Sequence, residues 1–137
     1  MKKNILLLFL AIGNVAISQI HDYGLAQKLS TRFYGAQRCG DTKSHLHGAC
    51  HTTDGKDAGV ELTGGWHDCG DYLKFNHTGA YAAVALLQAY TWFPESYPDE
   101  YAQDYSSGLP NGVPDILDEV KIYTDYLLKC LHGGKVY

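Results

Sequence analysis

Apolar residues recur at helical spacing in two stretches of the first two thirds of the chain. In the first, roughly Tyr23 to Tyr34, Leu25, Leu29 and Phe33 lie four residues apart and form one stripe. The second, roughly Thr78 to Trp92, is rich in alanine and apolar around most of its circumference. A helix of that composition is typically buried, so we expect neighbours on several of its faces.

A third helical stretch begins at Pro114, a favourable first helical position, and has two aspartates in its first turn. Lys121, Asp125 and Lys129 are spaced four apart, which predicts two exposed ion pairs on its polar face. A glycine pair that starts at Gly133 predicts its end. The apolar face consists of Ile116, Leu117, Val120, Tyr123, Leu127 and Leu128.

Two long irregular segments separate the helices. Residues 36–76 are rich in glycine and contain three of the four cysteines and several histidines. A loop of that length in a compact domain is usually functional or disordered, and this concentration of reactive side chains favours function. Residues 95–112 are rich in Tyr, Asp, Ser and Pro, which is typical of a surface loop.

The N-terminus has the composition of a secretory signal peptide. Lys2 and Lys3 precede an apolar run from Ile5 to Ile17, with small residues before a cleavage site near Ser18–Gln19. The alternative, a retained membrane anchor, is disfavoured because the run is short. We therefore predict residues 1–18 as a signal peptide and 19–137 as the mature part, secreted from a bacterial cell with no membrane segment left after cleavage.

The net charge and the composition narrow the classes of molecule that this chain could bind. The formal net charge is −4, and the chain contains 11 tyrosines. Nucleic-acid binding depends on a basic patch, so this class of partner is excluded, whereas a polar ligand that stacks on aromatic rings fits. Three helices with two long loops bury little core, so we expect this chain to be a fragment of a larger domain.

Two carboxylates stand out in the glycine-rich segment. Asp68 and Asp71 are three residues apart with Gly70 between them, and a turn there can bring both to one side to hold a single water. One carboxylate could deprotonate the water while the other orients it. The alternative is that they only cap a turn or the next helix. Calcium is a third interpretation, but one short pair falls short of its oxygen cage.

Two aromatic residues, Trp66 and Tyr72, flank the carboxylates and are candidates for stacking on a ligand. For Trp66, core packing is an equally good interpretation.

Cys39, Cys50, His51 and His67 could form a tetrahedral zinc site. Their spacing matches no compact zinc-finger pattern, and on the residues alone we favour a Cys39–Cys50 disulfide, which is natural in a secreted protein. Other candidates for the fourth ligand are His45, His47 and His77. Cys69 and Cys130 are expected to be free thiols.

Three blocks of the sequence, in order, closely resemble glycoside hydrolase family 9, the endoglucanases and related cellulases. They are residues 32–40 (RFYGAQRCG), 62–76 (LTGGWHDCGDYLKFN) and 111–121 (NGVPDILDEVK). The resemblance implies an all-α (α/α)6 barrel, of which this chain supplies the first few helices and the active-site loop. It also implies inverting hydrolysis of β-1,4-glucosidic bonds in cellulose or related β-glucans, without an organic cofactor.

The resemblance assigns roles to individual residues. Asp71 matches the family's catalytic base, and Asp68 matches the carboxylate that helps to bind the water. A bacterial subset of the family carries a structural zinc, whose ligands would correspond to Cys39, Cys50, His51 and His67, and this shifts our preference from the disulfide towards zinc. Cys69 replaces the alanine that is usual in the family.

The family's general acid is a glutamate that would lie beyond Tyr137, and neither Glu61 nor Glu119 stands in a matching motif. We therefore expect residues 1–137 alone to be inactive. The alternative function is a non-catalytic, glucan-binding or metal-stabilised module.

Overall fold

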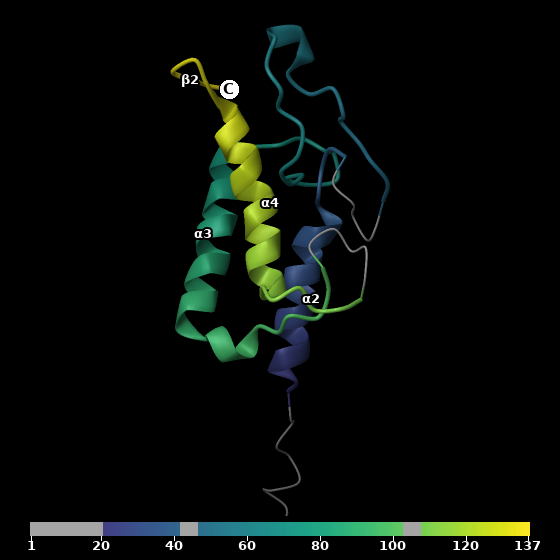
Figure 1. The fold of residues 1–137 in the computed structure, drawn as a ribbon, viewed down its shortest axis with the longest axis vertical. Helices are drawn as coiled ribbons and strands as arrows, with labels where there is room; N and C mark the ends of the chain where they lie inside the picture. Colours follow the sequence, from purple (N-terminus) through teal and green to yellow (C-terminus); the bar gives the residue numbers. More distant parts are fainter. Residues whose placement is uncertain (1–20, 42–46, 103–107) are drawn as a thin grey trace, which may run out of the picture.

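The computed structural model describes residues 21–41, 47–102 and 108–137. The predicted signal peptide and His45 lie outside these residues. Within them, three α-helices dominate (Figure 1): α2 (Tyr23–Ala36), α3 (Asn76–Trp92) and α4 (Asp115–Cys130). Two short 3-10 helices lie at Lys56–Ala58 and Pro94–Ser96. All three predicted helices are confirmed.

The helix ends follow local chemistry. The Asp22 side chain caps α2 by accepting a hydrogen bond from the Leu25 amide at 2.8 Å. At the other end of the chain, α4 runs into a short antiparallel hairpin of β1 (Leu131–His132) and β2 (Lys135–Val136). The predicted glycine stop is therefore the turn of a hairpin: both glycines have positive φ, as such a turn requires.

Helix α4 is the centre of the fold. Helices α3 and α4 lie side by side, and α2 contacts α4 on another side (Figure 1). The Trp66 ring, from the glycine-rich segment, stacks on Tyr123 with centroids 4.7 Å apart. Gly79 lets α3 approach, because a Cβ there would lie 2.2 Å from the Tyr123 hydroxyl. The buried core cluster consists of Trp66, Ala83, Val120, Tyr123, Tyr126 and Cys130.

Apolar faces of α2 and α3 are exposed, and the burial predicted for α3 is wrong for this chain. On α2, the apolar stripe of Leu25, Leu29 and Phe33 is more than half exposed, and the buried residues of the helix are Thr31 and Gly35. On α3, which we expected to be buried on several faces, only Ala83 is buried. Among the described residues the main helix partner of both α2 and α3 is α4, and large apolar side chains of both helices stay exposed.

The ion pairs predicted on α4 form in part. Lys121 and Asp125 pair at 2.5 Å, as expected. Lys129 instead bonds the Glu61 carboxylate at 2.8 Å and the Thr63 carbonyl at 2.9 Å. The glycine-rich segment thus lies against the end of α4 and takes Lys129 away from its neighbour on the helix.

The acidic residues that begin α4 do more than complement the helix dipole. Asp115 accepts the backbone amides of Glu100 and Tyr101, and Asp118 accepts the Asn111 side chain at 2.8 Å. Burial raises the pKa of both carboxyls. These bonds attach the loop between α3 and α4 to the start of α4.

Candidate active site and metal site

Two extended segments, residues 37–39 and 65–67, are joined by backbone hydrogen bonds and position the site. The Cys39 amide donates to the Gly65 carbonyl at 2.9 Å, and the His67 amide donates to the Gln37 carbonyl at 2.8 Å. Arg38 and Trp66 face each other in this antiparallel bridge. The segment that follows α2 therefore holds the residues that lead into Asp68.

A buried ion pair attaches this bridge to α4. The Arg38 guanidinium donates from Nη2 to Glu119 Oε1 at 2.5 Å and from Nε to Oε2 at 3.1 Å. Both side chains are completely buried. Sequence reasoning missed this pair. Each partner stands in one of the motif blocks, but no local spacing indicates that the two charges meet.

Lys74 is a second anchor that sequence reasoning missed. Its ammonium bonds the Asp54 carboxylate at 2.6 Å and the carbonyls of Leu62 and Gly64 at 2.7 and 3.1 Å. It also lies 4.6 Å from the centroid of the Tyr126 ring. Lys74, which follows the two carboxylates, thus binds residues 54–64, which precede them.

Asp68 and Asp71 lie in one exposed turn. The Asp68 amide donates to the Leu73 carbonyl at 2.7 Å, and the Tyr72 amide donates to the Cys69 carbonyl at 3.1 Å. Tyr72 takes a positive φ of 62°, which is uncommon for a bulky residue and keeps the turn narrow. Both carboxylates are exposed. The turn therefore presents two carboxylates to solvent from a rigid support.

Each carboxylate has local partners. Asp68 Oδ1 accepts the Thr78 hydroxyl at 2.5 Å. Asp71 Oδ1 accepts the Cys69 thiol at 2.8 Å and the Leu73 amide at 3.2 Å. The Cys69 hydrogen bond, followed by that of Leu73, lowers the pKa of Asp71, so this carboxyl is ionised at neutral pH. Asp71 therefore caps its own turn through the Leu73 amide, as the turn-capping interpretation expects, but neither carboxylate caps the backbone of α3.

The two aromatic candidates lie in different surroundings. Trp66 is 4% exposed and belongs to the core, whereas Tyr72 is 51% exposed. A cavity of about 150 Å³ opens beside Asp68. It is lined by Phe33, Tyr34, Gln37, Trp66, His67, Asp68, Phe75, Thr78, Gly79 and Ala82.

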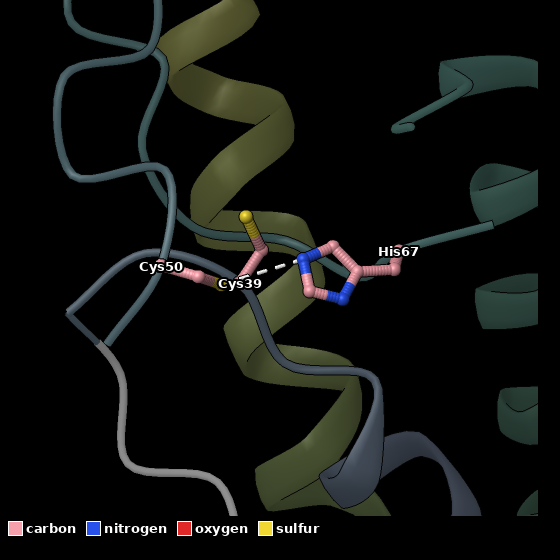
Figure 2. A group of neighbouring side chains, drawn as sticks. All are labelled: Cys39, Cys50 and His67. Atoms are coloured by element: carbon pink, nitrogen blue, oxygen red, sulfur yellow. Dashed lines mark hydrogen bonds between the residues drawn. The ribbon is translucent and has the colours of Figure 1, made fainter. Parts of the chain in front are cut away.

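Three of the four predicted metal ligands converge (Figure 2). The ligand atoms of Cys39, Cys50 and His67 all lie within 4.8 Å of one another, and Cys50 Sγ is 3.4 Å from His67 Nε2. Cys39 belongs to a second such group with His51 and Asp54. The structure therefore places His51 beside the cluster and adds Asp54, which sequence reasoning missed because it looked for thiols and imidazoles.

The other candidates for the fourth ligand are less well placed. The His47 ring stacks on His67 with centroids 5.5 Å apart, but its Nδ1 lies 2.7 Å from the Gly48 carbonyl. His77 is exposed on α3. Neither belongs to a ligand group among the described residues.

The donor set suits zinc. Two sulfurs and an imidazole nitrogen, with a further imidazole or carboxylate nearby, are the ligands that Zn²⁺ prefers. Burial raises the pKa of the Cys39 thiol to about 12, so this thiol stays protonated unless a cation replaces its proton. Burial also lowers the pKa of His67, which favours the neutral ring that binds metals. All four cysteines are free thiols in the structure.

Comparison with known proteins decides the family. The model of glycosyl hydrolase family 9 matches residues 23–137. The chain belongs to glycosyl hydrolase family 9. It is 36% identical to Endoglucanase 4 of Bacillus sp. (strain KSM-522) over 82% of this chain and 17% of that protein. It is 35% identical to Endoglucanase A of Bacillus pumilus over 83% of this chain and 16% of that protein.

Solved structures of family 9 share its fold. An endoglucanase from the termite Nasutitermes takasagoensis matches with a TM-score of 0.63 and 26% identity, over 82% of this chain and 25% of that one. A metagenome-derived family 9 endoglucanase matches with a TM-score of 0.58 and 33% identity, over 79% and 22%. The predicted all-α class is confirmed, and the three helices are part of an (α/α)6 barrel.

The chain thus spans about one sixth of the length of the two bacterial relatives. Among the helices of the described residues, none has the length and apolar character that a membrane crossing requires.

Proposed function

We propose that the protein to which this chain belongs hydrolyses β-1,4-glucosidic bonds in cellulose or a related β-glucan, as an endoglucanase with inversion. Family membership and relatives that are named endoglucanases support the reaction class. The observation that carries the proposal is the exposed turn with Asp68 and Asp71, braced by the bridge to residues 37–39.

In this proposal Asp71 is the general base. Its carboxylate removes a proton from a water molecule as the water attacks the anomeric carbon, and Asp68 accepts the second proton of that water in a hydrogen bond. In an inverting glycosidase the general acid lies about 6.5–9.5 Å from the base, across the scissile bond. The acid protonates the leaving oxygen, so atoms and charge balance.

The glutamates that the sequence offered are poor candidates for this acid. Glu119 is buried against Arg38, and Glu61 is held by Lys129. We therefore propose that the acid belongs to another part of the domain and that residues 1–137 alone do not hydrolyse glucan. A non-catalytic binding module remains the alternative function.

The test uses the full-length protein and carboxymethylcellulose, with release of reducing ends as the readout. Asp71→Asn should lower kcat by about 10²–10⁴-fold, the usual contribution of a general base. Asp57→Asn, at another exposed aspartate of the same segment, is the matched control and should retain activity. An Asp71→Asn enzyme as active as its parent would exclude Asp71 as the base. No activity of the parent on any β-glucan would favour the binding module.

We also propose a structural zinc held by Cys39, Cys50, His67 and His51. When bound, the ion would supply cross-linking and not catalysis, because it would hold His67, the residue before Asp68, against the segment after α2. Metal analysis of the purified protein should find one zinc per chain, which Cys50→Ser should remove. Titration of free thiols after chelation separates this from the Cys39–Cys50 disulfide, which would leave both sulfurs unreactive and the protein free of zinc.

We also propose that the protein is secreted. Lys2, Lys3 and the apolar run that follows support a signal peptide. Mass spectrometry of the protein from the culture medium or periplasm should show a mature chain that begins near Gln19. A protein that keeps Met1 and stays inside the cell would contradict it.

A further inference from the structure

Two donors hold the same oxygen of Asp71. The Cys69 thiol lies 2.8 Å from Asp71 Oδ1, and the Leu73 amide lies 3.2 Å from that oxygen. The Tyr72 amide closes the turn on the Cys69 carbonyl at 3.1 Å. Cys69 and Leu73, which lie on either side of Asp71 in the turn, thus both donate a hydrogen bond to the same carboxylate oxygen.

We propose that Cys69 is a positioning residue for the general base: its thiol donates to Asp71 Oδ1 and fixes the rotation of the carboxylate, so that Oδ2 faces the nucleophilic water. This inference rests on the proposed function of Asp71. A carboxylate with one oxygen held by two donors loses most of its freedom about the last torsion of the side chain. It therefore spends more of its time in the orientation that accepts a proton.

Cys69 has no competing structural task in the described residues. Its side chain is exposed, so it does not fill the core. It also lies outside both groups of converging metal ligands, which contain Cys39 and Cys50. An alanine, the residue that is usual at this position in the family, would keep the turn but has no proton to donate.

In the described part of the chain, the titratable groups near the turn include Asp68, His67 and His51. Asp68 lies in the same turn and accepts the Thr78 hydroxyl of α3. The rings of His67 and His51 lie 4.8 and 6.3 Å from the Tyr72 ring, measured between centroids. Replacement of Cys69 leaves all of these in place, so a change at Asp71 in that variant reports on the thiol.

The pKa of Asp71 gives a second readout. The Cys69 hydrogen bond is the largest cause of its lowered pKa, and the Leu73 amide is the next. Removal of the thiol should raise the pKa of Asp71 towards its ordinary value. The acid limb of the pH profile of kcat should then move to higher pH. A merely structural role of Cys69 would not move this limb.

The experiment compares full-length wild type, Cys69→Ala and Cys69→Ser on a soluble cello-oligosaccharide across the acid pH range. Cys69→Ala should lower kcat by about threefold to tenfold at the optimum, the range of one modest hydrogen bond, with KM unchanged. Its acid limb should shift upward. Cys69→Ser keeps a donor at the same place and should recover most of the loss.

Two results would overturn the proposal: wild-type kcat and pH profile in Cys69→Ala, or a serine variant that behaves like the alanine variant. Failure of the underlying assignment would look different. In that case Asp71→Asn would retain activity whatever stands at position 69, and Asp71 would need no positioning for catalysis.

Discussion

Two ion pairs of equal length and opposite burial allow a quantitative test of what holds the site to the fold. Arg38 Nη2 lies 2.5 Å from Glu119 Oε1, and both side chains are completely buried. Lys121 Nζ lies 2.5 Å from Asp125 Oδ2, and these side chains are 59% and 51% exposed. The pairs differ in their exposure to water and in the second bond, from Arg38 Nε to Glu119 Oε2, that the buried pair makes.

The expected costs of breaking the pairs differ several-fold. Removal of one partner of a buried pair leaves an uncompensated charge in the interior and costs about 3–5 kcal/mol. An exposed pair contributes about 0.2–1 kcal/mol, because water replaces the lost partner. Glu119→Gln should therefore destabilise the full-length protein far more than Asp125→Asn does. Both changes keep the shape of the side chain and remove its charge.

The assay is urea unfolding followed by circular dichroism, with the free energy of unfolding obtained from midpoint and slope. A double variant, Arg38→Met with Glu119→Leu, removes both charges and should be more stable than Glu119→Gln. The reasoning would be refuted by a Glu119→Gln cost as small as that of Asp125→Asn. It would also fail if the double variant were less stable than Glu119→Gln.

Two further predictions concern packing and pH. Gly79→Ala should lower stability by about 1–3 kcal/mol because its Cβ would meet the Tyr123 hydroxyl, whereas Gly24→Ala in α2 should not; thermal unfolding of the two variants checks this. Desolvation raises the pKa of Glu61, but the hydrogen bonds from Lys129 and Thr63 and the Lys129 charge together outweigh it, and the pKa falls from 4.5 to about 2. A lowered folded pKa stabilises the protein above pH 4.5 and loses this effect as the pH falls towards 2. Glu61→Gln should therefore flatten the dependence of Tm on pH in that window, and an unchanged dependence would contradict the role of Glu61.

The sequence predicted the helices well because their signals are local. Pro114 is a signal read from a few neighbouring residues, and α4 begins one residue after it in the structure. Burial was predicted less well. Helix α3 was expected to be buried and only its Ala83 is, because composition says which faces are apolar but not what covers them.

The candidate site divides in the same way. Asp68 and Asp71 are three residues apart, so the turn that unites them was visible in the spacing. The convergence of Cys39 and Cys50 with His67 was proposed from residue types and is seen in the structure. Asp54 was missed, because a carboxylate several residues from the nearest thiol is an ordinary loop residue until the chain folds back.

By itself, the sequence determined the three helices, the turn with its two carboxylates and the family motifs, since each of these depends on residues close together in the chain. Only the tertiary structure decided which charges that are distant in the chain meet. Arg38 pairs with Glu119 across 81 positions, and Lys129 leaves Asp125 for Glu61. The physical reason is that the strength of a charge pair depends on burial and on the partners that folding brings near, and neither is written in local spacing.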